Sequence, residues 1–423
     1  MNKLTSLLNL ELNKISLTKE ENLILKKETA LLIKELNNSI KRVKIKAQVF
    51  VGGSFAKNTI IKKDKYDIDL FVRFNSSYDE EQISKLIAKI IPKKAQRVHG
   101  SRDYFVLKSN NQEINLEFEI IPVLSIKKPE QARNITDLSY FHVKYVVNKI
   151  KKIPRLAEEI KLTKAFLHFQ ECYGAESYIR GISGYAVELL IINFGSFEKF
   201  LKGIIKTKQD KKLIIDSERL YSKGQVLREL NEAKLQSPII LIDPTFKDRN
   251  ALASLSQQTF DKLRDSAQKF LKNPSEDFFV KKDKERDFEG SNNNIVKLEI
   301  KTDRQAGDIA GTKLKKFYKF FIDESSRFLD MSGSEFIYDE KHNFAKILIN
   351  PSSKKEIFFQ GPPLIMKEAF EKFKKEHKNI QIKDGKSFAY EKGFSSFKEF
   401  LSFFKNNNSN KIKSMGIVSF ELV

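Results

Sequence analysis

The feature that most constrains this fold is a strand-like segment that carries two acidic side chains. Residues 66–74, YDIDLFVRF, alternate well enough to predict a β-strand. Because side chains alternate across a strand, Asp67 and Asp69 emerge on one face while Ile68 packs behind them. Two carboxylates on one strand face can share a pair of divalent cations, but D-x-D can also be the solvated face of an edge strand.

A glycine pair precedes this segment in a pattern typical of phosphate binding. Residues 47–51, AQVFV, predict a short buried strand that stops at Gly52 and Gly53 and gives way to SFAKNT, the start of a helix. Such a turn can bind phosphate through backbone N–H groups. A triphosphate there would meet the Ser54 hydroxyl and the Lys57 ammonium, although a glycine pair alone can equally be an ordinary turn.

A second acidic strand could complete the site. Residues 114–123, INLEFEIIPV, predict a strand that should end at Pro122. Glu117 and Glu119 lie on one face of it, and either could supply the third anionic oxygen that a two-metal site needs. The first domain is therefore expected to be α/β-like, with a mixed or antiparallel sheet.

Periodicity divides the rest of the chain. Residues 18–21 form a capping box, and the apolar period after it predicts a helix to about Ile40. The pattern turns helical over 140–201, and the helix at 260–271 could belong to either side of the best linker, the three asparagines at 292–294. Strands and helices beyond it predict an α+β domain. The expected domains span 1–140, 141–258 and 259–423.

Composition indicates a folded protein that binds polyanions. The 423 residues are 40% hydrophobic, and 77 Lys and Arg against 55 Asp and Glu give a net charge of +22. This balance favours phosphate contacts, or else a lysine-rich surface of no specific use. No apolar run of membrane-spanning length occurs, and a single cysteine, Cys172, is compatible with a reducing cytoplasm.

Together these motifs resemble a known family. The series G-G-S-x-x-x-x-T, D-I-D and a carboxylate before I-I-P is similar to the nucleotidyltransferase fold of the polymerase-beta superfamily. Further segments, in the family's order, resemble the archaeal class I CCA-adding enzymes. These segments are DLSYFH at 137–142, Lys164 with YGAE at 173–176, RGISGY through ELL at 180–190, FGSF at 194–197, residues 243–250 and GPP at 361–363.

The resemblance implies a fold and an activity. It implies an α+β protein with a polymerase-beta-like nucleotidyltransferase head, a helical nucleotide-binding neck and a C-terminal α+β tRNA-binding body and tail. Such an enzyme adds C, C and A to the tRNA 3′ end from CTP and ATP without a template, with Mg²⁺ as cofactor. The implied partners are the tRNA acceptor end, ATP and CTP in the cytoplasm, with no membrane, and a homodimer is left open.

The resemblance also implies roles for single residues. The metal carboxylates would be Asp67, Asp69 and Glu119, with Glu119 preferred to Glu117 because the family's third carboxylate stands three residues before a proline. The nucleotide-binding residues would be Gly53, Ser54, Lys57, His142, Lys164, Tyr173 and Arg249. Ser54 and Lys57 match triphosphate contacts, and Arg249 matches an arginine that helps to read the incoming base. Taken alone, Arg249 could simply be an ion-pair partner of a neighbouring aspartate.

The sequence also departs from the family's pattern and leaves alternatives. The loop between Thr59 and Asp67 is slightly longer than in the family, and residues 100–104, GSRDY, replace a histidine-containing motif, so Arg102 is a candidate to replace that histidine near phosphate. The rival functions are a poly(A) polymerase or oligoadenylate-type synthetase, and a catalytically inactive RNA-binding homologue. An inactive homologue would normally have lost a carboxylate, and all three are present.

Overall fold

The computed structural model describes residues 3–207, 211–222 and 224–423. The chain forms two compact units. The first comprises the residues up to Ala175 together with Ile179–Val280, and the second comprises Glu176–Tyr178 together with Lys281–Val423. The first unit contains both the sheet and the helices that carry the candidate site.

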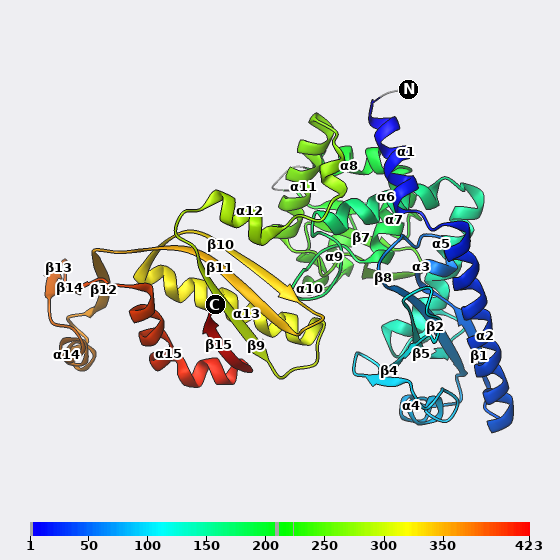
Figure 1. Ribbon diagram of the computed structural model, residues 1–423, viewed down its shortest axis with the longest axis horizontal. Helices are drawn as coiled ribbons and strands as arrows, with labels where there is room; N and C mark the ends of the chain where they lie inside the picture. Colours follow the sequence, from blue (N-terminus) through cyan, green and yellow to red (C-terminus); the bar gives the residue numbers. More distant parts are fainter. Residues whose placement is uncertain (1–2, 208–210, 223) are drawn as a thin grey trace. The chain divides into compact units, whose positions relative to one another are not determined.

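A five-stranded sheet forms the N-terminal part of the first unit. In spatial order its strands are β1 (Ala47–Val51), β2 (Tyr66–Asn75), β5 (Leu116–Ser125), β4 (Tyr104–Lys108) and β3 (Gln96–Val98) (Figure 1). Strands β2 and β5 are parallel, and the other neighbours are antiparallel. The expectation of a mixed or antiparallel sheet is therefore confirmed in its mixed form.

Pro122 does not end its strand, contrary to the expectation from sequence. Strand β5 continues through Pro122 to Ser125. Its pairing with β4 reaches only Ile120, so on that side Pro122 has no neighbouring strand to which it would need to donate a hydrogen bond. The proline sits where a missing N–H costs little.

Helix α2 (Lys19–Val43) covers this sheet. Thr18 Oγ1 accepts a hydrogen bond from the N–H of Glu21, whose side chain accepts one from the N–H of Thr18, so the expected capping box is confirmed. The apolar stripe that includes Leu25 and Leu36 packs into the sheet's core. Two shorter helices of this part are α3 (Gly53–Ala56) and α4 (Glu80–Ile87), and 3₁₀ turns follow at Pro129–Gln131 and Ile135–Leu138.

A layer of helices completes the first unit. Its fully buried Phe166, Phe197 and Phe270 contact one another edge-on or tilted, and a hydrophobic core surrounds them. The helices are α1 (Lys3–Ile15), α5 (Ser139–Lys152), α6 (Leu156–Phe169), α7 (Gly184–Phe194), α8 (Phe197–Lys206), α9 (Val226–Glu229), α10 (Glu232–Leu235) and α11 (Gln257–Lys272), with a 3₁₀ turn at Glu276–Phe279. A small sheet of β6 (Leu213–Ile215), β7 (Ile239–Asp243) and β8 (Phe246–Asn250) joins them.

The second unit is α+β, as the sequence predicts. One sheet has the order β10 (Leu329–Asp339), β11 (Phe344–Ser353), β9 (Val296–Thr302) and β15 (Ile417–Leu422), and the other has the order β12 (Glu356–Pro363), β14 (Lys386–Lys392) and β13 (Ile380–Lys383). The helices are α12 (Lys284–Ser291), α13 (Asp308–Phe328), α14 (Lys367–Glu376) and α15 (Phe397–Ser414) (Figure 1). Helices α13 and α14 lie close to the helices that the sequence predicts at about 310–328 and 366–377, whereas the sequence predicts no helix where α15 lies.

The described structure places the change of unit earlier than the asparagine linker. Helix α11 buries Leu263 and Phe270 in the core of the first unit, and the second unit's main segment begins at Lys281. Residues 292–294 lie between α12 and β9, inside the second unit. Among the described residues, no helix combines the length and the apolar character that a membrane crossing requires.

Candidate active site

The turn after β1 leaves no room for a side chain. A Cβ on Gly52 would lie 2.1 Å from the ring of Phe71, and one on Gly53 would lie 1.6 Å from Oδ2 of Asp69. Gly53 also has a φ of +57°, in the left-handed region that favours glycine. The glycine pair therefore allows the backbone of this turn to lie directly against the Asp69 carboxylate.

Strands β2 and β5 bring the predicted carboxylates onto one face. In their parallel register Asp67 lies opposite Glu117, and Asp69 lies opposite Glu119. Paired residues of adjacent strands point to the same side of a sheet, so all four carboxylates share the face that Gly53 borders. The expectation that Asp67 and Asp69 share one face of a strand is confirmed.

The two candidates for the third carboxylate have different surroundings. Lys65 Nζ lies 2.8 Å from Oε2 of Glu117, and Lys108 Nζ lies 3.8 Å from its Oε1. Burial raises the pKa of Glu119 to about 7, and the negative charges of Asp69 and Asp67 add to this effect. Because Glu117 already forms ion pairs with two lysines, these contacts favour Glu119 as the carboxylate that would bind a metal cation.

The chemistry of this face fits a divalent cation. Burial also raises the pKa of Asp69 to about 6, with the charge of Lys57 opposing the rise and that of Asp67 increasing it. Carboxylates that lie close together and have raised pKa values are stabilised in their ionised form when a cation binds beside them. In the described part of the chain, no three acidic, histidine or cysteine side chains are already grouped as ligands of one ion. The fit therefore rests on the donor types and the strand register.

Two lysines predicted to bind the nucleotide, Lys57 at the triphosphate and Lys164 at a position not specified further, meet at one buried carboxylate. Lys57 Nζ donates to Oε2 of Glu188 at 2.6 Å, and Lys164 Nζ donates to Oε1 of Glu188 at 3.1 Å. Thr59 Oγ1 accepts from Lys164 at 2.9 Å and donates to Glu188 at 3.1 Å. The charges of both lysines also oppose the rise in the pKa of Asp69. The N–H of Thr59 donates to the carbonyl of Ser54, which joins this cluster to the glycine turn beside Asp69. Lys57 follows α3 and Lys164 lies on α6, so the cluster joins the sheet to the helical layer.

A second buried carboxylate joins His142, predicted to bind the nucleotide, to Arg249, predicted to help read the incoming base. Asp243, at the end of β7, is fully buried, and its Oδ2 lies 3.0 Å from His142 Nε2 and accepts from Arg249 Nη1 at 2.8 Å. Its Oδ1 accepts from the Tyr185 hydroxyl at 2.9 Å and from Thr245. Burial opposes ionisation of Asp243, but the hydrogen bond from His142 and the charge of Arg249 hold its pKa far below the usual range.

The Asp243 contacts also orient aromatic rings. The His142 ring stacks on Tyr185 with centroids 4.0 Å apart, and the Arg249 guanidinium lies 5.6 Å from the centre of the same Tyr185 ring. Burial lowers the pKa of His142, so the neutral ring is favoured, with Nε2–H donating to Asp243. Arg249 is thus an ion-pair partner of Asp243, one of the two roles that its sequence context suggested. Its role in reading a base stays a prediction.

Tyr173 lies beside the start of α7. A Cβ on Gly184 would lie 2.8 Å from the Tyr173 hydroxyl, and the Tyr173 backbone forms a parallel bridge with Ile182. Helix α7 begins at Gly184 and carries both Tyr185 and Glu188. Tyr173 therefore packs against the first residue of α7, the helix that carries Glu188. Its contact with a nucleotide stays a prediction.

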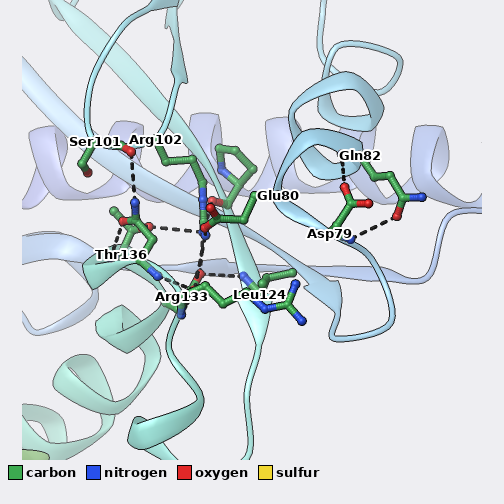
Figure 2. A network of polar contacts seen from close by, with 11 residues as sticks. Asp79, Glu80, Gln82, Ser101, Arg102, Leu124, Arg133 and Thr136 are labelled. Carbon is green, nitrogen blue, oxygen red and sulfur yellow. Dashed lines mark hydrogen bonds and ion pairs between the residues drawn. The ribbon is translucent and has the colours of Figure 1, made fainter.

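Arg102 is held by carboxylates of its own domain. Figure 2 shows its side chain directed at Glu80 and Thr136, and its Nη atoms form ion pairs with Glu80 and with the buried Asp137. Asp137 also accepts the backbone N–H of Leu124 at 2.9 Å. With only 5% of its side chain exposed, Arg102 anchors the loop before β4, which argues against the phosphate contact considered from sequence.

Sequence reasoning missed the roles of Glu188 and Asp243, although each left a signal. Glu188 is the one charged residue in the helix GYAVELLIINF, and a charge in an apolar helix is rarely buried unless it is paired. Asp243 ends the apolar strand IILID, where a buried carboxylate also needs partners. In both cases the residue is visible in the sequence, but the partners come from distant segments.

Two protein-family models match the two segments of the chain that carry this site. The nucleotidyltransferase domain family matches residues 33–138, and the family described as tRNA nucleotidyltransferase, second domain, matches residues 158–280. Among solved structures, the RNA terminal uridylyl transferase Cid1 is 13% identical, covers 66% of this chain and 98% of its own, and superposes with a TM-score of 0.51. That similarity shows the nucleotidyltransferase fold.

Curated relatives narrow the family. The CCA-adding enzyme of Nanoarchaeum equitans is 35% identical over 291 residues, which cover 68% of this chain and 68% of that enzyme. The CCA-adding enzyme of Methanocaldococcus jannaschii is 29% identical over 376 residues, which cover 86% and 82% of the two chains. The predicted resemblance is confirmed, and the chain belongs to the archaeal CCA-adding enzymes, a family of tRNA nucleotidyltransferases.

Proposed function

We propose that Asp67, Asp69 and Glu119 hold two Mg²⁺ ions and with them carry out the CCA addition of this tRNA nucleotidyltransferase. Mg²⁺ bound there would lower the pKa of the tRNA terminal 3′-hydroxyl and stabilise the leaving pyrophosphate. The carboxylates would hold the ions on one strand face, and the backbone of the glycine turn lies against the same face. The observation that carries the proposal is the parallel register of β2 and β5, which puts Asp67, Asp69 and Glu119 on one face beside the glycine turn. The raised pKa of Asp69 and of Glu119 agrees with carboxylates that a bound cation would stabilise.

The triphosphate would lie between the glycine turn and the lysine cluster. Ser54 follows Gly53 directly, and the charges of Lys57 and Lys164 act on Asp69, where they oppose the rise in its pKa. A Mg²⁺-bound triphosphate on the carboxylate face would meet these donors with its remaining oxygens. The residues align the α-phosphorus for in-line attack by the tRNA hydroxyl, with pyrophosphate leaving.

Arg249 and His142 would contact the nucleoside. Arg249 Nη1 is committed to Asp243, and the side chain keeps a quarter of its surface exposed, so further guanidinium donors can face a base. Cytosine and adenine both present a ring-nitrogen acceptor where uracil and guanine present an N–H. This difference would favour CTP and ATP.

The tRNA would be held chiefly through phosphate contacts. The net charge of +22 supplies the required surplus of cations, and an A-form major groove is too deep and narrow for side chains to read. We assign this role to the lysine-rich surface and, in particular, to the C-terminal tRNA-binding part. That part is expected over 259–423, after a catalytic head at 1–140 and a helical part at 141–258, and most of it lies in the second unit. The buried Cys172 is compatible with a cytoplasmic location, and a homodimer is left open.

One assay tests the proposal directly. The protein is incubated with Mg²⁺, tRNA lacking its 3′ CCA, and each labelled nucleotide in turn, and the product ends are sequenced. We expect C, C and A to be added and synthesis to stop. A homopolymer of A, or oligoadenylate without tRNA, would instead assign a poly(A) polymerase or an oligoadenylate-type synthetase.

A further inference from the structure

We propose that Glu188 is the positioning residue for the nucleotide triphosphate, because it holds Lys57 of the head and Lys164 of the helical layer at one point beside the carboxylate face. This inference rests on the proposed function, since it assigns a role to a residue that acts through Lys57 and Lys164, the two lysines proposed to bind the triphosphate. Nothing in the reaction itself requires a carboxylate inside helix α7.

The first argument is the energetic cost of this carboxylate. Glu188 is 1% exposed and lies in the otherwise apolar helix α7. Removing a carboxylate from water is strongly unfavourable unless close partners compensate. Burial opposes ionisation of Glu188, yet the charges of Lys57 and Lys164 lower its pKa below the usual range. The pairing is therefore strong enough to keep the buried group charged.

The second argument is geometric. The two ammonium groups occupy different oxygens of one carboxylate, with Lys57 on Oε2 and Lys164 on Oε1. Two like charges so close would repel without the anion between them. Glu188 therefore allows two cations to converge from two different structural layers, which is the arrangement that a multiply charged phosphate chain requires.

The third argument concerns the donors that remain. An ammonium group has three N–H donors, and the hydrogen bond from Lys57 to Glu188 uses one of them. Lys164 directs its three donors to Glu188 and to the hydroxyl and carbonyl oxygens of Thr59, so the donors that remain are those of Lys57. Thr59 closes the cluster, because its N–H donates to the carbonyl of Ser54 at 2.9 Å in the glycine turn. The cluster thus connects the lysines to the turn that borders Asp69.

The test is the substitution Glu188→Gln, which keeps the shape of the side chain and removes its charge. We expect the KM for both CTP and ATP to rise at least about tenfold, while kcat falls less than about threefold and the KM for tRNA is unchanged. Glu188→Asp, which keeps the charge on a shorter side chain, should recover part of the loss. An unchanged or lower KM for the nucleotides in Glu188→Gln would overturn the proposal.

Glu159→Gln is the matched control. Glu159 is another buried carboxylate of the helical layer, which accepts from Arg155 at 3.0 Å and from the N–H of Phe197 at 2.9 Å. This variant should lower the Tm without changing the KM for nucleotides. An equal rise of the nucleotide KM in both variants would show a general effect of packing and overturn the assignment to Glu188.

Two further measurements keep the test decisive. If Glu188→Gln does not fold, Thr59→Val removes the hydroxyl that links Lys164 to Glu188, and it should raise the nucleotide KM by about threefold; no rise would overturn the proposal. Failure of the wild-type enzyme to add C, C and A would refute the proposed function itself. A wild-type enzyme that adds CCA, combined with a Glu188→Gln variant of normal KM, would refute only this inference.

Discussion

A methyl group at Gly53 should inactivate the enzyme by displacing one carboxylate. In Gly53→Ala the new Cβ would lie 1.6 Å from Oδ2 and 2.7 Å from Cγ of Asp69, and both contacts must lengthen to about 3 Å or more. The carboxylate therefore has to move by more than about 1 Å, and a misplacement of that size can cost about a hundredfold in rate. The left-handed φ of +57° adds about 1–2 kcal/mol of strain for alanine.

The chain offers a control that separates strain from displacement. Gly195 ends α7 with a φ of +81°, and a Cβ there would meet no atom within 4 Å. Gly195→Ala should therefore lower the Tm by a few degrees, as the strain alone predicts, and leave the rate nearly normal.

The assay is single-turnover incorporation of CMP into tRNA lacking CCA, together with the Tm and the tRNA affinity of each variant. Gly53→Ala should lose about two orders of magnitude in rate relative to Gly195→Ala while it keeps its tRNA affinity. A folded Gly53→Ala variant with a rate within about threefold of the control would refute the reasoning, because Asp69 would then tolerate displacement.

Three other results should follow from the same site. Asp67→Ala or Asp69→Ala should abolish nucleotide addition and leave tRNA affinity within a few-fold, as measured by turnover and filter binding; substantial turnover would exclude their metal role. Arg249→Ala should narrow the preference for CTP and ATP over UTP and GTP by about ten- to a hundredfold in steady-state incorporation, whereas unchanged selectivity would leave Arg249 as an ion-pair residue. Folding raises the pKa of Glu119 from an ordinary 4.5 to about 7, so between these pH values the native state binds more protons than the unfolded chain. Without metal, the stability of the protein should therefore fall as the pH rises through this interval. Mg²⁺ should therefore raise the Tm more at pH 8 than at pH 5, and an equal rise would contradict a metal site at Glu119.

The strands and carboxylates of the head could be predicted closely because the residues that define them lie near one another in the sequence. The spacing Asp67-x-Asp69 fixes one strand face, and the glycine pair before it marks the close approach of the turn to Asp69. Strand periodicity predicted both ends of β1 correctly and both ends of β2 to within one residue. The end of β5 was missed because a proline breaks a strand only where a neighbour needs its N–H, and pairing is not visible in one segment.

The division into units was harder to predict because it depends on which core a helix enters. Helix α11 is strongly amphipathic, but amphipathicity does not say which surface its apolar face meets. The polar run at 292–294 resembles a linker, yet it is a short connection inside the second unit. Helix α15 was missed because its second half, KNNNSNKIKS, has low helix propensity, while buried Phe400 and Phe404 in its first half fix it on the sheet.

The partners of buried charges explain why the nucleotide-binding half of the site was only partly predictable. Lys57 and Glu188 are 131 residues apart, and His142 and Asp243 are 101 residues apart, so no local pattern relates them. Each buried carboxylate must find cations or donors on other elements, because an unpaired charge in the core would cost more than the fold can tolerate. The same requirement fixes Lys57, Lys164, His142 and Arg249 in place before a nucleotide arrives. We therefore expect a substitution at Glu188, inside apolar helix α7, to change the use of CTP and ATP without altering any carboxylate of the strand face.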